Sequence, residues 1–122
     1  GKPYDIEFVI DRARELIKSR EAAGDAGGET ILLIDDSLTF RQTLKSILTD
    51  AGYNVVTAEN GESGLRVAGN LRPAAIVVDS AMPGIDGATV IRRVRLDAVL
   101  RRTPCLLLTG AEGKNAEIEA LD

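Results

Sequence analysis

The chain contains an unbroken apolar run over residues 31–34 (ILLI), followed directly by two aspartates, Asp35 and Asp36. A short apolar run of this kind is typical of a strand that is buried on both faces of a parallel sheet. The end of such a strand would bring two neighbouring carboxylates out of the core and into contact with solvent. Because the two charges repel each other, a bound cation would stabilise them, and the pair indicates a cation site.

Two further apolar runs end in oxygen-bearing side chains. Residues 74–79 end in an aspartate, and residues 105–109 end in a threonine. Because the carboxyl ends of parallel strands meet at one edge of a sheet, we expect these terminal side chains to gather with Asp35 and Asp36. Strand-end Asp and Thr residues are also common turn formers and helix caps, which is the alternative for any one of them alone. Three such strand ends together favour a functional site.

Strand and helix patterns alternate from residue 30 to the end of the chain. Gly52 suits the end of the first helix in this part, and Asn60 suits the N-cap of the second. The pattern predicts strands over residues 30–35, 53–58, 74–79 and 105–109, and helices over residues 37–51, 61–68, 88–101 and 115–121. Repeated βα units predict an α/β fold, a doubly wound parallel sheet that binds its ligands at the carboxyl ends of the strands.

A separate amphipathic segment precedes the alternating part. Residues 5–21 have apolar side chains at helical spacing, with charged side chains on the opposite side. The apolar stripe consists of Ile6, Val9, Ile10, Ala13, Leu16 and Ile17. Residues 23–29 are small and rich in glycine, which predicts a flexible linker. We therefore divide the chain into residues 1–22, the linker, and a domain core over residues 30–122.

The composition supports one globular unit. With 122 residues, of which 44% are hydrophobic, the chain can bury one core but is too short for two domains. Its net charge of −4 lacks the positive field that nucleic acids require, so proteins and small anions are the expected partners. We find no signal peptide and no apolar stretch of about 18 residues, so we expect no membrane partner and a cytoplasmic location. The single cysteine, Cys105, lies in an apolar strand pattern and is expected to be buried.

The strand-end side chains suit phosphoryl chemistry. Mg²⁺ prefers carboxylate and carbonyl oxygens in octahedral geometry, so Asp35, Asp36 and Asp79 together would suit it. If Asp79 projects furthest into the opening, its carboxylate can act as a nucleophile toward phosphorus while the cation neutralises charge on the transferred group. Thr109 could then donate a hydrogen bond to a phosphoryl oxygen.

These residues are shared with a known family. Residues 30–122 resemble the receiver domain of bacterial two-component response regulators, on the Asp35-Asp36 pair, Asp79 in VVDSAMPGIDG and Thr109 in LLLTGA. The resemblance implies a flavodoxin-like fold, with strand order 2-1-3-4 for the strands that the sequence contains. It also implies that Asp79 accepts a phosphoryl group from a histidine of a sensor kinase.

The resemblance further implies a set of ligands for Mg²⁺. Asp36, Asp79 and the backbone carbonyl of Ala81 would bind the ion directly, and Asp35 would act largely through water. The MPG turn after Ala81 and the later Gly87 strengthen the match, because the chain must bend tightly beside the phosphorylated side chain.

The chain departs from the receiver pattern at both ends. A receiver continues with a fifth strand, a Lys-Pro pair and a final amphipathic helix, and none of these follows the predicted helix over residues 115–121. Instead, Lys2-Pro3 and the amphipathic segment stand at the start of the chain and resemble the end of a receiver. Residues 1–22 are then either the remainder of a preceding receiver in a tandem-receiver protein, or a completion of this sheet. The completion would occur within the chain or by exchange in a domain-swapped homodimer.

Lys2 is the candidate cation for a phosphoryl oxygen if it joins the site, as the resemblance implies. The alternative is a solvated terminal lysine. Because the fifth strand is missing and the lysine is displaced, we expect slow phosphorylation of Asp79 by a small phosphodonor.

The leading hypothesis is a receiver that takes a phosphoryl group onto Asp79, with Mg²⁺, from a sensor histidine kinase or a phosphotransfer protein. It would be a switch rather than a turnover enzyme, with a second receiver or an output domain as further partners. The chain contains no histidine and cannot carry the donor imidazole. The alternatives are a phosphorylation-silent interaction module and a phosphatase with an aspartyl nucleophile. The phosphatase is disfavoured because a second downstream acid pair and a cap insertion are missing.

Overall fold

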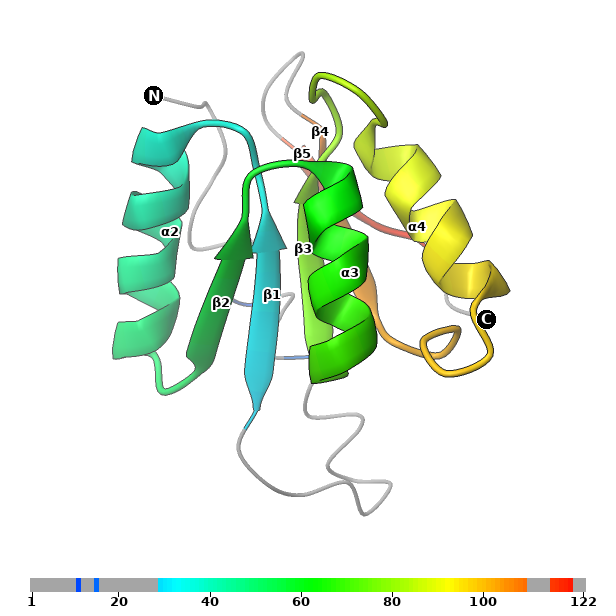
Figure 1. Ribbon diagram of the computed structural model, residues 1–122. Helices are drawn as coiled ribbons and strands as arrows, with labels where there is room; N and C mark the ends of the chain where they lie inside the picture. Colours follow the sequence, from blue (N-terminus) through cyan, green and yellow to red (C-terminus); the bar gives the residue numbers. More distant parts are fainter. Residues whose placement is uncertain (1–10, 12–14, 16–28, 110–114, 120–122) are drawn as a thin grey trace.

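The computed structural model describes residues 11, 15, 29–109 and 115–119. From residue 29 onward, strands and helices alternate as the sequence predicts until the end of the fourth strand (Figure 1). The elements are β1 (Thr30–Ile34), α2 (Leu38–Asp50), β2 (Asn54–Ala58), α3 (Gly61–Leu71), β3 (Ala75–Asp79), α4 (Gly87–Leu96), β4 (Cys105–Thr109) and β5 (Asn115–Glu119).

The sheet has the strand order β2-β1-β3-β4-β5 in the described part of the chain. β1 is parallel to both β2 and β3, and β3 is parallel to β4. The predicted order 2-1-3-4 of a flavodoxin-like sheet is therefore confirmed. Because β1 and β3 are neighbours, the residue that ends β3 lies beside the residues that follow β1.

The predicted helix over residues 115–121 is wrong. Residues Asn115–Glu119 form β5, which pairs with β4 in antiparallel register from Cys105↔Glu119 to Thr109↔Asn115. A helix of so few residues is unstable alone, whereas an extended segment satisfies the backbone donors and acceptors along the outer edge of β4. Ala116 and Ile118 alternate with polar residues, a pattern that also suits a strand. Among the described residues, the parallel fifth strand of a receiver does not occur, and β5 takes its place beside β4.

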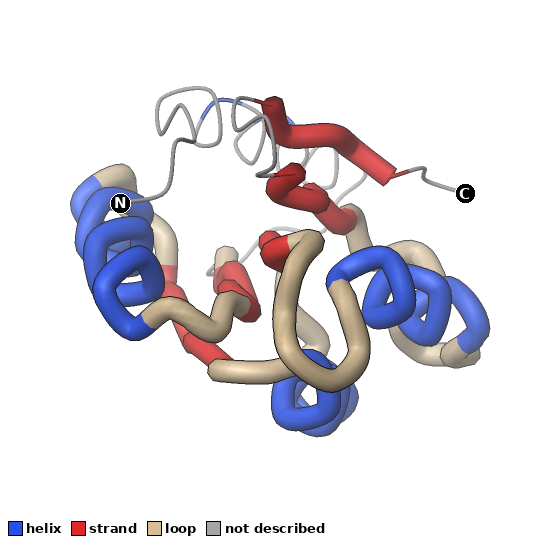
Figure 2. Tube along the Cα trace, turned by 90° about the horizontal axis from the view of Figure 1, so that it is seen from above, coloured by secondary structure: helices blue, strands red, loops and turns tan. Residues whose placement is uncertain are grey.

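Two apolar layers cover the sheet. Figure 2 shows α2 on one side of the sheet and α3 and α4 on the other. The layer on the side of α2 consists of Ile31, Leu33, Phe40, Leu44, Leu48, Ala75, Val77, Leu106 and Leu108. The layer under α3 and α4 includes Leu32, Ile34, Ile76, Val78, Val90, Val94, Cys105 and Leu107. Alternate residues of each central strand face opposite layers, which explains why these strands are apolar throughout.

The helices begin at the side-chain caps that the sequence offers. Ser37 Oγ accepts a hydrogen bond from the Phe40 amide at 3.3 Å, and α2 follows. Asn60 Oδ1 accepts from the Ser63 amide at 2.8 Å, which confirms Asn60 as the N-cap of α3. These caps satisfy backbone donors that lack partners within the first turn of a helix.

The third helix of the core is shorter than predicted. The sequence pattern extends it to residue 101, but α4 ends at Leu96. Asp97 Oδ1 accepts hydrogen bonds from the amides of Val99 at 2.8 Å and Leu100 at 3.1 Å. A side chain that binds nearby amides in this way offers the backbone an alternative to the helix, so the chain turns here.

The N-cap of α4 is a charged side chain. Asp86 Oδ1 accepts from the Thr89 amide at 2.9 Å. Hydrogen bonds from the side chain and the backbone of Thr89 lower the pKa of the Asp86 carboxyl below its usual value. The cap is therefore ionised at neutral pH, and its negative charge lies at the positive end of the helix dipole.

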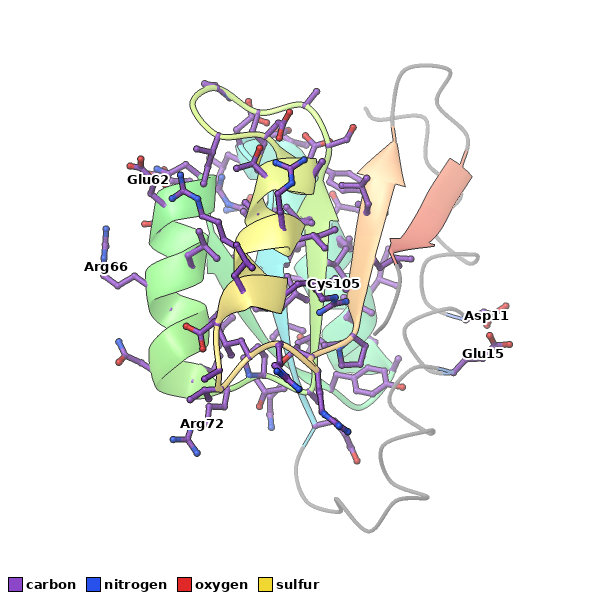
Figure 3. The ribbon with its side chains drawn as sticks, turned by 90° about the vertical axis from the view of Figure 1, so that its right-hand side faces the viewer. Asp11, Glu15, Glu62, Arg66, Arg72 and Cys105 are labelled. Atoms are coloured by element: carbon purple, nitrogen blue, oxygen red, sulfur yellow. The ribbon has the colours of Figure 1, made fainter. Side chains whose placement is uncertain are left out.

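A stabilising substitution is expected at the end of α3. The C-cap residue Arg72 has a left-handed backbone with φ of 53°. Glycine adopts this conformation without steric cost, so Arg72→Gly should raise the free energy of unfolding by about 0.5–1 kcal/mol. Urea denaturation measures the change. Arg66→Gly is the matched control, since Arg66 is exposed within the same helix (Figure 3), and a glycine there should cost about 1 kcal/mol.

Most of the amphipathic segment lies outside the described residues. Within it, the structure describes Asp11 and Glu15, and both are helical and exposed. The predicted linker over residues 23–29 also lies outside, except for Glu29, and the proposed division of the chain stays a prediction. Among the described helices, none is both long enough and apolar enough to cross a membrane. Cys105 is buried in β4, as expected.

Candidate functional site

Three carboxylates converge at the carboxyl edge of the sheet. Asp35 and Asp36 follow β1, and Asp79 is the last residue of the neighbouring β3. One carboxylate oxygen from each of the three lies within 4.8 Å of the other two. Asp35 is 0% and Asp79 1% exposed, whereas Asp36 is open to solvent. The predicted gathering of these three residues is therefore present in the structure.

The turn from β1 to α2 is held by several hydrogen bonds around Asp35. Its Oδ1 accepts from the Ser37 amide at 2.7 Å, and its own amide donates to the Ala58 carbonyl at 3.1 Å. Arg41 Nη1 donates to the Asp35 backbone carbonyl at 2.7 Å. The Arg41 amide also donates to the Ser37 carbonyl at 2.9 Å. The side chain and the backbone of Arg41 therefore both hold the turn that presents Asp36.

Sequence reasoning did not identify Arg41. The available signal was its position one helical turn after the cap residue Ser37, from which a long side chain can reach back to the strand end. Because a charged donor makes a comparatively strong hydrogen bond, Arg41 is the residue that we expect to restrain this turn most.

Replacing Arg41 with methionine should lower the free energy of unfolding by about 1.5 kcal/mol, since a hydrogen bond from a charged donor is lost. Urea denaturation tests this expectation. Lys45→Met is the control, because Lys45 is an exposed cation on the same helix. Equal stability of the two variants would show that the bond to the Asp35 carbonyl contributes nothing.

The loop after β3 bends closely around Asp79. The Ala81 amide donates to Asp79 Oδ1 at 3.5 Å, and the Ser80 amide donates to the Leu108 carbonyl at 3.0 Å. Gly84 has a positive φ of 82°, which favours glycine over other residues. The tight turn that the MPG sequence predicts is therefore confirmed.

Gly87 lies close to the backbone of Asp79. It is the first residue of α4, and its amide donates to the Ser80 carbonyl at 3.2 Å. A Cβ atom on Gly87 would overlap the backbone carbonyl oxygen of Asp79 and lie 2.7 Å from Leu107 Cδ1. The lack of a side chain at this position lets α4 begin directly against the strand end.

The remaining predicted site residues are only partly described. Thr109 is the last residue of β4, one residue beyond the Asp79↔Leu108 pair, so its backbone lies at the same edge. Ala81 lies two residues after Asp79 and is exposed, and the role of its carbonyl as a ligand stays a prediction. Lys2 lies outside the described residues.

The donor set suits a hard divalent cation. Three carboxylates supply oxygen ligands from two chain segments, and two of the three are buried. Mg²⁺ prefers such oxygens and keeps several waters, for which the exposed side of Asp36 leaves access. The residues present therefore fit the ion that the sequence predicts.

Comparison with known families agrees with this geometry. The profile of the family described as "Response regulator receiver domain" matches residues 31–122. The chain belongs to the response regulator receiver domain family. Receiver domains of this family act as signalling switches in two-component systems and interact with histidine kinases or phosphotransfer partners. They bind Mg²⁺ at an acidic site such as the one formed by Asp35, Asp36 and Asp79.

Curated relatives of this receiver domain are longer proteins. The transcriptional regulatory protein AfsQ1 of Streptomyces coelicolor is 40% identical over 92 residues, which cover 75% of this chain and 38% of that protein. The response regulator PleD of Caulobacter vibrioides is 36% identical over 92 residues, which cover 75% of this chain and 20% of that protein. The chain therefore spans well under half of the length of these relatives.

Solved receiver structures share the fold. Chemotaxis protein CheY4 of Vibrio cholerae superposes with a TM-score of 0.65 at 35% identity, covering 70% of this chain and 74% of that one. The receiver domain of a sensor histidine kinase from Pseudomonas aeruginosa superposes with a TM-score of 0.65 at 31% identity, covering 68% of each chain. That structure has a magnesium ion coordinated in its active-site cleft.

Proposed function

We propose that this receiver domain accepts a phosphoryl group on Asp79 from a phosphohistidine of a sensor histidine kinase or a phosphotransfer protein, in the presence of Mg²⁺. The observation that carries the proposal is the convergence of three carboxylates, two of them buried, at the carboxyl edge of a parallel sheet. In such a sheet this edge is where ligands bind.

The proposed reaction is an exchange of one bond to phosphorus for another. A carboxylate oxygen of Asp79 forms the new O–P bond while the P–N bond to the donor imidazole breaks, and the imidazole nitrogen keeps the bonding electron pair and takes a proton. Asp36, Asp79 and the Ala81 carbonyl would hold Mg²⁺ directly, and Asp35 would act largely through water. The bound ion supplies positive charge next to the transferred group.

Thr109 and Lys2 are proposed to contact the phosphoryl oxygens. The hydroxyl of Thr109 would donate a hydrogen bond from the end of β4, and Lys2 would supply a second cation. Phosphorylation of Asp79 would change the charge at the end of β3, and this would change the surface that partners contact.

The wider setting is also part of the proposal. We propose a switch rather than a turnover enzyme, with a second receiver or an output domain as further partners and without direct binding to nucleic acid or membrane. The proposal includes a cytoplasmic location. The tandem-receiver origin and the domain-swapped homodimer stay predictions.

Magnesium binding is the first test. Asp36→Asn should weaken Mg²⁺ affinity at least about tenfold, or about 1.4 kcal/mol, because an anionic ligand becomes a neutral one. Isothermal titration calorimetry measures this change. Asp50→Asn, which removes an exposed carboxylate at the end of α2, should leave the affinity unchanged.

Two outcomes would favour the alternatives. If the unmodified chain binds neither Mg²⁺ nor beryllofluoride with Mg²⁺, the domain is a phosphorylation-silent interaction module. Sustained turnover of a phosphate ester by the purified chain would instead indicate a phosphatase with an aspartyl nucleophile.

A further inference from the structure

Part of the sheet is buried on a side where no described helix lies over it. On the side of α2, the inward residues of β3 and β4 are Ala75, Val77, Leu106 and Leu108. Their exposed fractions are 1% for Ala75 and 0% for the other three. A side chain on the face of a sheet becomes inaccessible to water only when a second layer packs on that face, because neighbouring strands cover its flanks alone.

The described helix on this side supplies only part of that layer, because Phe40, Leu44 and Leu48 of α2 share the cluster but lie mainly over β2 and β1. α2 packs on β2 and β1, at the opposite end of the sheet from β4 (Figure 1). α3 and α4 pack on the other side (Figure 2). β5 extends the sheet sideways by pairing with the edge of β4. The described helices and strands therefore leave most of the cover over Leu106 and Leu108 unaccounted for.

Among the segments that lie mostly outside the described residues, one is long and apolar enough to supply this cover. Residues 110–114 and 120–122 are too few to form a helix that covers two strands. Residues 5–21 carry the stripe of Ile6, Val9, Ile10, Ala13, Leu16 and Ile17, which has to be buried somewhere.

We propose that this apolar stripe packs across the α2 side of β3 and β4 within the same chain. The two described residues of the segment support the arrangement. Asp11 and Glu15 are both helical, and they are four residues apart on the polar side of the stripe. Figure 3 places them on the side of the sheet opposite to α3, with their side chains pointing away from the sheet. In the proposed arrangement, the apolar side of the segment would face the strands.

The linker is long enough for this contact to form within one chain. Residues 22–28 separate the segment from the described chain before β1 and can span up to about 24 Å. β3 lies directly beside β1, at a strand spacing of about 4.8 Å, and even the distance between two stacked sheets is only about 10 Å. A partner chain is therefore not needed to deliver the segment.

The arrangement has a consequence for Lys2. A helix over residues 5–21 is about 25 Å long, whereas a strand of five residues spans about 17 Å. With its last turn near the start of β1, the helix would run antiparallel to the strands, and its first turn would reach the edge that carries Asp79. Lys2, three residues before the helix, would lie near that edge.

A double-mutant cycle in the full chain tests the contact. Leu16→Ala and Leu106→Ala should each lower the urea midpoint, and the double variant should lose less than the sum of the two shifts, because the residues touch the same cavity. Cys105→Ala is the matched control. Cys105 precedes Leu106 in β4 but faces the layer under α3 and α4. The shifts in urea midpoint caused by Cys105→Ala and Leu16→Ala should therefore be additive in the double variant.

Milder variants keep the test informative if the alanine variants do not fold. Ile10→Val should lower the midpoint measurably, whereas Glu15→Gln on the polar side should leave it unchanged. The proposal is overturned if Ile10→Val and Leu16→Ala both leave the midpoint unchanged, or if Leu16 couples to Cys105 rather than to Leu106. It is also overturned if sedimentation shows a dimer that Leu16→Ala converts to monomers, since the stripe would then cover a second copy.

Discussion

Asp79→Asn is expected to abolish labelling of the chain by acetyl phosphate in the presence of Mg²⁺. An amide oxygen does not attack phosphorus as a carboxylate does, so the variant lacks the only side chain that we assign as acceptor. Incorporation of phosphate, followed by mass spectrometry of the intact chain, should fall to background. The expected effect is a complete loss rather than a slower rate.

Two measurements distinguish loss of the acceptor from loss of the fold. Asp79 is buried beside two other carboxylates, so removing its charge relieves repulsion, and the variant should be at least as stable as the unmodified chain. Asp50→Asn should label at the unmodified rate, since Asp50 is exposed at the far end of α2. Persistent labelling of Asp79→Asn would show that another side chain accepts the group.

Gly87→Ala is expected to damage both stability and phosphorylation. The new Cβ atom would overlap the Asp79 carbonyl oxygen and lie 2.7 Å from Leu107 Cδ1, so α4 or the end of β3 must move. Overpacking of this kind costs about 1–3 kcal/mol in free energy of unfolding. Because the displaced backbone carries Asp79, the proposed acceptor, labelling by acetyl phosphate should also slow.

Gly69→Ala is the matched control for this substitution. Gly69 also lies in a helix, α3, but a Cβ atom there would meet nothing within 4 Å. Alanine should therefore stabilise the chain at this position by about 0.5–1 kcal/mol through its higher helix propensity. If both glycine variants are as stable as the unmodified chain, the close approach of Gly87 to Asp79 is not a constraint on the fold.

Much of the site could be predicted from local patterns. The apolar runs that end in Asp35-Asp36 and in Asp79 predict strands, and parallel strands bring their carboxyl ends to one edge. The cap at Asn60 and the bend at Gly84 follow from residue types whose side chains or backbone suit one local geometry. These features depend on a few neighbouring residues, so a short sequence window contains the information.

Other features depend on individual contacts that apolar periodicity does not reveal. The pattern over residues 88–101 suits a helix, but Asp97 binds the amides that would continue it. Arg41 acquires its role only because α2 lies against the end of β1. The overlap that restricts position 87 involves the Asp79 carbonyl, eight residues earlier in the chain. None of these contacts can be predicted from the spacing of residues in the sequence alone.

The sequence by itself determined the alternation of strands and helices, the buried strands and the acids at their ends, because these follow from apolar periodicity and local hydrogen bonding. Only the tertiary structure decided that residues Asn115–Glu119 form a strand that pairs with the edge of β4 in antiparallel register. The physical reason is that the backbone groups along an open sheet edge need partners, and that need outweighs the weak helix preference of five residues.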